Sequence, residues 1–242
     1  MSDVRFHPLP DSRRIAFRHT TGTGPAFVFL PGYMSDMAGG KATALFDWAA
    51  AQGRQCLLLD YSGCGESPGD FANGTLSRWR EEVLALVECH CEGPVVLIGS
   101  SMGGWMMLLV ARELGARAVG LVGVAAAPDF TDWGYDAAQK TGLAAGRPVF
   151  EASPYGPEPT PTYPGFWADG QALRQLEGEI PVDCPVRLLH GQEDAEVPSA
   201  ISLRLAQALR SSDVQVTLVK GGDHRLSREQ DIALLLQTVS AF

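Results

Sequence analysis

The sequence predicts an α/β fold, built on a mostly parallel, doubly wound sheet with an inserted cap. Three observations indicate this fold. Apolar runs of strand length recur along the 242 residues, helix-like segments separate them, and one proline-rich stretch interrupts the alternation. Strand–helix alternation implies crossover connections and therefore parallel strands. Unbroken apolar runs are typical of strands that helices cover on both faces.

Six runs are the predicted parallel strands: AFVFLP, CLLLD, VVLIG, VGLVGVAA, VRLLH and VQVTLV, at residues 26–31, 56–60, 95–99, 119–126, 186–190 and 214–219. The first 19 residues favour two short edge strands. Helix-like segments follow most runs, at residues 38–51, 76–90, 102–114, 199–210 and 227–241. A chain of this length buries about 70–75% of its unfolded surface, so it needs neither a disulfide nor a metal to hold it together.

The stretch 129–181 interrupts the alternation of strand-like and helix-like segments. It holds 7 of the 16 prolines and 8 of the 20 aromatic residues, and it is too long for a bare loop in a compact domain. We therefore expect an α/β core at 1–128 and 182–242 and a cap, or lid, at 129–181. Several cap aromatics should face the cleft; the full set is Phe130, Trp133, Tyr135, Phe150, Tyr155, Tyr163, Phe166 and Trp167. The residues predicted to contact the substrate are Trp105, Trp133, Phe166 and Trp167.

A nucleophilic serine is indicated by the pattern Gly-x-Ser-x-Gly, which occurs at 65–69 and at 99–103. In hydrolases this serine lies on a sharp turn between a strand and a helix, and the next residue donates its backbone N–H to the oxyanion. Ser67 fails because Pro68, the next residue, has no N–H. Ser101 follows the strand VVLIG, precedes a helix, and has Met102 to donate. We predict Ser101 as the nucleophile.

A serine needs a base to take its proton, and in this kind of sheet the base is a histidine that follows the acid in the chain. His190 and His224 are the histidines after Ser101. His190 ends an apolar strand, which favours a buried structural role. His224 follows the last strand, where a loop carries its side chain to the catalytic edge. We predict His224 as the base.

The acid should follow the preceding strand, and Asp194 is the predicted residue that orients the histidine and stabilises its charged form. Glu193 and Glu196 are alternatives that more often would be solvated loop charges. The second oxyanion donor should come from the loop after residues 26–31. We predict the Tyr33 N–H for this role, together with that of Met102; the alternative is a plain Pro-Gly turn.

Charge and composition exclude several function classes. Lys plus Arg is 19 and Asp plus Glu is 28, a net charge of −9, which argues against nonspecific binding to nucleic acids. No apolar run approaches the about 18 residues of a membrane span, and the first residues have no apolar signal region. The five cysteines are an odd number and favour reduced thiols. These features predict a cytoplasmic location.

Five segments of the sequence resemble a known family. PGYMSDM, DYSGCGES, GSSMGGW, IPVDCPVRLLHG and DHR, at 31–37, 60–67, 99–105, 180–191 and 223–225, are similar to the α/β-hydrolase superfamily, in the branch of palmitoyl-protein thioesterase and mycophenolic acid acyl-glucuronide esterase. The resemblance covers about 26–240 and implies a triad at Ser101, Asp194 and His224. The cap matches poorly, so the substrate is left open. The family's mitochondrial forms carry a longer N-terminus that is absent here.

The predicted function is hydrolysis of a carboxylic ester or thioester through an acyl-serine intermediate. The substrate would be a small molecule or an acylated protein, and the chemistry needs no cofactor or metal. Two alternatives are an acyltransferase or perhydrolase that uses the same triad, and a catalytically inactive ligand-binding module of the same fold. Sequence alone gives neither the oligomeric state nor the acyl group.

Overall fold

The computed structural model describes residues 3–153 and 156–242. Its centre is an eight-stranded sheet in the order β1-β2-β4-β3-β5-β6-β9-β10. In chain order these strands are Arg5–Pro8, Arg14–Thr20, Thr23–Leu30, Arg54–Leu59, Val95–Ser100, Ala118–Val124, Val186–Gly191 and Val214–Val219. From β4 to β10 all neighbours are parallel, and the β1–β2 hairpin joins β4 antiparallel. The mostly parallel sheet agrees with the predicted pattern. The first residues form two strands as expected, but only β1 lies at the edge, because β2 pairs with β4 as well as with β1.

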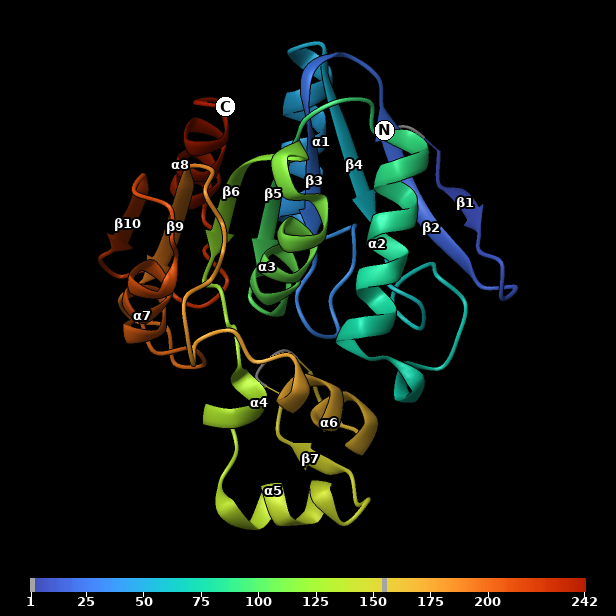
Figure 1. Cartoon of the computed structure of the whole chain (residues 1–242), viewed down its shortest axis with the longest axis vertical. Coiled ribbons are helices and arrows are strands. Elements are labelled where there is room, and N and C mark those ends of the chain that lie inside the picture. Colours follow the sequence, from blue (N-terminus) through green and yellow to red (C-terminus); the bar gives the residue numbers. More distant parts are fainter. Residues whose placement is uncertain (1–2, 154–155) are drawn as a thin grey trace.

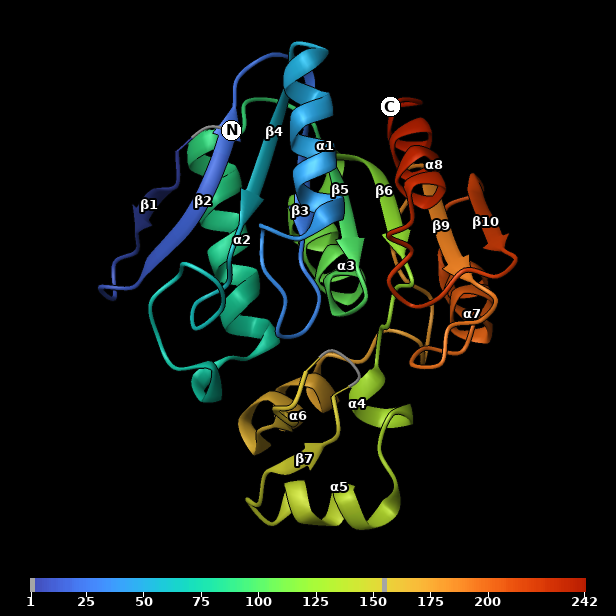
Figure 2. The same cartoon turned by 180° about the vertical axis from the view of Figure 1, so that it is seen from behind.

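Helices cover both faces of the sheet, as Figures 1 and 2 show from opposite sides. One face carries α2 (Leu76–His90), α3 (Met102–Leu114) and α7 (Ala200–Ala208). The other carries α1 (Gly40–Ala51) and α8 (Glu229–Val239). Each layer has its own apolar core against the sheet. Short 3-10 turns at Phe71–Asn73 and Gly115–Arg117 complete this part of the chain.

The proline-rich stretch forms separate structure between β6 and β9. It contains α4 (Phe130–Trp133), α5 (Ala137–Ala144), the antiparallel pair β7 (Val149–Glu151) and β8 (Thr160–Thr162), and α6 (Pro164–Ala172). Figure 1 shows these elements grouped below the carboxyl ends of the central strands. The edge at which ligands bind in such sheets therefore faces the inserted segment. The cap boundaries 129 and 181 stay a prediction.

An aromatic cluster joins the inserted segment to the core. The ring of Phe166 on α6 lies 4.8 Å from that of Tyr33, 5.7 Å from that of Trp79 and 5.7 Å from that of Phe130. Phe166 is 1% exposed. Because edge-to-face and tilted ring contacts at these distances are favourable, the cluster fixes the inserted segment above the end of the sheet.

Candidate active site

Ser101 lies on a strained turn between β5 and α3, where its φ of 54° is unusual for a residue with a side chain. The glycines around it make this turn possible. A Cβ on Gly99 would collide with the backbone of Gly103, one on Gly103 with the Leu30 carbonyl, and one on Gly104 with Ala126. The glycine pattern therefore lets α3 pack close to two strands while the serine projects at the sheet edge.

Two loops bring a histidine and an aspartate to this serine. His224 lies between β10 and α8, and its Nε2 is 3.0 Å from Ser101 Oγ. Asp194 follows β9, and its Oδ2 is 2.9 Å from His224 Nδ1. The three residues predicted from the sequence thus form a continuous hydrogen-bonded chain, although 123 residues separate the serine from the histidine.

Asp194 is held from several sides, and its side chain has no exposed surface. Oδ1 accepts the N–H groups of Glu196 and Val197 at 2.9 and 2.8 Å. Burial opposes ionisation of this carboxyl. Hydrogen bonds from His190, His224 and the Val197 N–H outweigh that cost and hold its pKa well below the usual range. Asp194 is therefore ionised at neutral pH and faces His224 as an acceptor.

His190 is buried, as the sequence suggested, and its contacts explain why. Its Nδ1 is 2.7 Å from the Ser202 hydroxyl, and its Nε2 is 2.9 Å from the Val197 carbonyl. The same Nε2 lies 3.2 Å from Asp194 Oδ2. A carbonyl cannot donate, so Nε2 carries the proton and supports the loop that holds Asp194. The sequence did not indicate this supporting contact.

The two predicted oxyanion donors flank the serine. Met102 is the first residue of α3, so its N–H has no acceptor within the helix. On the other side Gly32 touches Ser101: a Cβ there would lie 3.4 Å from the Ser101 Cβ. Tyr33, the next residue, lines the same cavity. The side chain of Tyr33 turns to the inserted segment, where its hydroxyl donates to the Pro161 carbonyl at 2.9 Å.

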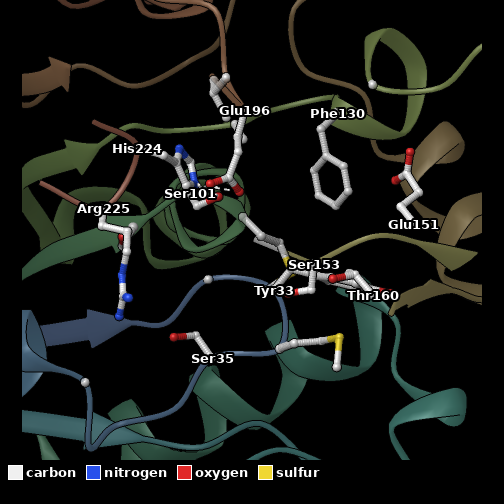
Figure 3. Close-up of a pocket in the computed structure, with 18 of the residues that line it drawn as sticks. Tyr33, Ser35, Ser101, Phe130, Glu151, Ser153, Thr160, Glu196, His224 and Arg225 are labelled. Carbon is white, nitrogen blue, oxygen red and sulfur yellow. Dashed lines mark hydrogen bonds and ion pairs between the residues drawn. The ribbon is translucent and has the colours of Figure 1, made fainter. Parts of the chain in front are cut away.

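A cavity of about 760 Å³ opens above Ser101, between the core and the inserted segment. Figure 3 shows Phe130, Glu151 and Thr160 from the inserted segment on the side of the pocket away from Ser101 and His224. The lining mixes apolar and charged side chains. The charged ones are Asp36, Lys41, Glu151, Glu158, Glu196 and Arg225.

Of the four aromatic residues predicted to contact the substrate, Trp133 lines the cavity. Trp105 and Phe166 do not, because they are 0% and 1% exposed and belong to the main core. Trp167 is also outside the lining, and its indole N–H donates to the Thr131 carbonyl. Phe130 and Tyr135 line the cavity instead. Tyr155, another predicted cap aromatic, lies outside the described residues.

Lys41 was missed by sequence reasoning. It is the second residue of α1, lines the cavity, and donates from Nζ to the Arg225 carbonyl, next to His224. Burial and the nearby Arg225 charge lower the pKa of Lys41 to about 8. A lysine in the first turn of a helix gives no sign in sequence that it will reach a loop 184 residues away.

Ser67, the second serine in a Gly-x-Ser-x-Gly pattern, has a structural role. It is 5% exposed. Its hydroxyl accepts the Ala16 N–H at 2.8 Å and donates to the Asp60 carbonyl at 2.6 Å. The oxygen thus joins strand β2 to the turn after β4, away from the cavity lining.

Replacing Ser67 by alanine is expected to lower stability rather than activity. The change leaves a buried N–H and a carbonyl without their partner, at a cost of about 1–3 kcal/mol in the free energy of unfolding. Urea denaturation would measure the cost, and the kcat of the folded variant should stay within about twofold of the wild type. An inactive but fully stable Ser67→Ala protein would contradict this assignment.

Residues 27–237 match the Alpha/beta hydrolase family. The chain belongs to this family. The predicted α/β-hydrolase fold is thereby confirmed, and this α/β-hydrolase also resembles solved structures along its whole length. A putative hydrolase from Agrobacterium vitis is 38% identical, with a TM-score of 0.92 and coverage of 99% of both chains. Mouse alpha/beta hydrolase domain-containing protein 10 is 33% identical, with a TM-score of 0.92 over 99% of this chain and 98% of its own.

Curated relatives of the hydrolase point to the branch that the sequence resembles. Human palmitoyl-protein thioesterase ABHD10 is 36% identical over 98% of this chain and 79% of its own length. The mouse protein of the same name is 38% identical over 93% and 77%. These relatives support a hydrolase, or thioesterase, activity.

The relatives also correct one prediction. Their names describe them as mitochondrial, so the cytoplasmic location predicted from the sequence is wrong. The missing apolar signal region and the odd number of cysteines that favoured the cytoplasm do not separate cytoplasmic from mitochondrial proteins, because they distinguish only secreted ones. Within residues 3–153 and 156–242, the hydrolase has no helix of the length and apolarity that a membrane crossing requires.

Proposed function

We propose that the protein cleaves carboxylic esters or thioesters through an acyl-serine intermediate, with Ser101, His224 and Asp194 as its catalytic triad. One observation carries the proposal: Ser101 Oγ, His224 and Asp194 are linked by contacts of 3.0 and 2.9 Å, and Ser101 and His224 line the cavity. Nucleophile, base and orienting acid in hydrogen-bond reach are the arrangement that activates a serine.

In the first half-reaction Ser101 Oγ attacks the acyl carbon while His224 Nε2 takes its proton. The backbone N–H groups of Tyr33 and Met102 stabilise the oxyanion, and the ionised Asp194 stabilises the imidazolium. His224 then protonates the leaving alcohol or thiol. In the second half-reaction His224 activates water, which releases the acid and restores Ser101.

The substrate class follows from the relatives and from the cavity. The similar human and mouse proteins are named palmitoyl-protein thioesterases, and the family resemblance adds acyl-glucuronides. We propose an acylated protein or a small acyl ester of these kinds as substrate. Kinetics on a panel of p-nitrophenyl esters, acyl-thioesters and acyl-glucuronides would rank these substrate classes. A protein that cleaves none of the three classes would contradict the proposal.

We expect kcat/KM to rise from acetyl to at least octanoyl esters. The cavity presents Phe130, Trp133, Tyr135 and Met34 to an acyl chain. Each methylene that leaves water contributes up to about 0.8 kcal/mol, which is about fourfold in kcat/KM. Steady-state kinetics over a series of p-nitrophenyl esters would measure the slope.

Trp133→Ala should flatten that slope, because it removes apolar surface from the cavity wall. Trp167→Ala is the matched control: it alters a half-buried tryptophan of the same segment outside the cavity lining, and it should leave the slope unchanged. Acetyl esters cleaved fastest by the wild type would show that these aromatics only hold the inserted segment together.

A further inference from the structure

A third ionisable side chain faces the reacting pair. Glu196 Oε2 lies 3.9 Å from His224 Nε2, the same nitrogen that contacts Ser101 Oγ. Glu196 lines the cavity together with these residues, and its side chain is 39% exposed. In Figure 3 it extends toward Ser101 and His224 from the side opposite Arg225. A carboxylate therefore borders the space in which a molecule must sit to react with the acyl-serine.

The position of Glu196 is set by the same groups that hold the histidine. Its N–H donates to Asp194 Oδ1 at 2.9 Å, and the N–H of Val197 donates to the same oxygen at 2.8 Å. The Val197 carbonyl in turn accepts from buried His190 at 2.9 Å. The backbone that carries Glu196 is thus held next to Asp194, the residue that contacts His224 Nδ1.

We propose that Glu196 selects water as the acceptor of the acyl group, which favours hydrolysis over acyl transfer. The inference rests on the acyl-serine mechanism proposed above. A water that attacks the acyl carbon must give one hydrogen to His224 Nε2. Glu196 Oε2 accepts its second hydrogen. Two hydrogen bonds of about 2.8 Å to acceptors this far apart subtend an angle of about 90°, close to the angle between the two hydrogens of water.

The step balances without any other reactant. The water oxygen forms a bond to the acyl carbon, and its first proton passes to His224 Nε2. When the tetrahedral intermediate collapses, the bond from the acyl carbon to Ser101 Oγ breaks and Oγ takes the proton back. The second hydrogen, held toward Glu196 during the attack, stays on the product acid. Glu196 orients the attacking oxygen and exchanges no proton.

An alcohol fits this arrangement poorly. Its single hydroxyl hydrogen must go to His224, so its alkyl group lies against the Glu196 carboxylate. Burying a charge against an apolar group, with no hydrogen bond in return, is unfavourable. Water has a second hydrogen and avoids this cost. Removal of the carboxylate should therefore slow hydrolysis but leave transfer to an alcohol largely intact.

The test uses the full-length enzyme with p-nitrophenyl octanoate in buffer that contains methanol. It compares wild type with Glu196→Gln and Glu196→Ala, and it measures the initial p-nitrophenol burst, octanoic acid and methyl octanoate. We expect a burst rate within about twofold of wild type and hydrolysis about tenfold slower, from the loss of a hydrogen bond to a charged group. The ratio of methyl octanoate to octanoic acid should rise about tenfold in Glu196→Ala, which has no acceptor, and less in Glu196→Gln, whose neutral amide oxygen can still accept a hydrogen bond.

Glu193→Gln is the matched control, because Glu193 is an exposed carboxylate of the same loop outside the cavity lining. It should keep both the burst and the product ratio. An intact burst with an unchanged product ratio in the Glu196 variants would overturn the role of Glu196 alone, as would an equal loss of burst and hydrolysis. A wild-type protein that forms no octanoyl-serine by mass spectrometry would overturn the acyl-serine mechanism and this inference together.

Discussion

Ser101→Ala should lower kcat at least about a thousandfold, because removal of a triad serine leaves only the residual effects of substrate binding and the oxyanion donors. The expectation is specific to this serine. Its φ of 54° aims the hydroxyl at the cavity, and its Oγ contacts His224. Alanine removes only an oxygen from a partly buried side chain, so the variant should fold normally. Steady-state hydrolysis of a p-nitrophenyl ester, corrected for background, would measure the loss.

Labelling with a fluorophosphonate gives an independent readout of the same prediction. Wild type and Ser67→Ala should be labelled, and Ser101→Ala should not. Labelled wild type also excludes the alternative of an inactive ligand-binding module. If Ser101→Ala kept its label and Ser67→Ala lost it, the nucleophile would be assigned to the wrong Gly-x-Ser-x-Gly pattern.

The sequence predicted those features whose cause is local. The parallel strands were found because helices cover both faces, so every residue of a run such as 95–99 is apolar. The turn at Ser101 could be told from that at Ser67 because Pro68 has no N–H, which is a property of one residue. The positions of His224 and Asp194 followed from the order of strands, since parallel strands all end at one edge of the sheet.

The direction of side chains on the cap and on α3 was beyond the sequence. α3 is apolar on nearly all sides, so periodicity does not tell which face meets the cavity. Trp105 faces inward instead, and its indole N–H donates to the Leu173 carbonyl beyond α6. Phe166 packs on Tyr33 and Trp79, residues that come from distant parts of the chain. Such choices depend on tertiary partners, which explains why Trp133 alone of the four predicted substrate-contact residues lines the cavity.

The contacts of Glu196 and Lys41 were hidden for a related reason. Glu196 was considered only as a rival for the acid, because a carboxylate two residues after Asp194 gives no sign of which atom of His224 it will face. In the structure it lies near Nε2, whereas Asp194 contacts Nδ1. The two carboxylates therefore occupy opposite ends of one imidazole ring, and only three-dimensional geometry separates their roles.

Asp194→Asn is expected to lower kcat by up to about ten-thousandfold while the protein stays folded. The reason lies in the two oxygens of Asp194. Oδ1 accepts two backbone N–H groups, so in the variant the amide oxygen is held there. The amide NH₂ then occupies the Oδ2 position and donates to His224 Nδ1. The proton of the neutral ring moves to Nε2, which can no longer accept the Ser101 proton.

Three measurements would test this account. Circular dichroism should match wild type, steady-state kinetics should show the loss in kcat, and stability should respond less to acid than in wild type. The pKa of Asp194 is depressed in the folded protein, so its stabilising contribution is complete above the unfolded carboxyl pKa of about 3.9 and declines as the pH falls below it; asparagine cannot titrate. Unchanged activity in Asp194→Asn would instead assign the acid to Glu196 or Glu193. Glu196 lies near Nε2 and Glu193 is outside the cavity lining, so neither is placed to hold His224 in the active tautomer. We therefore expect kcat to fall in Asp194→Asn.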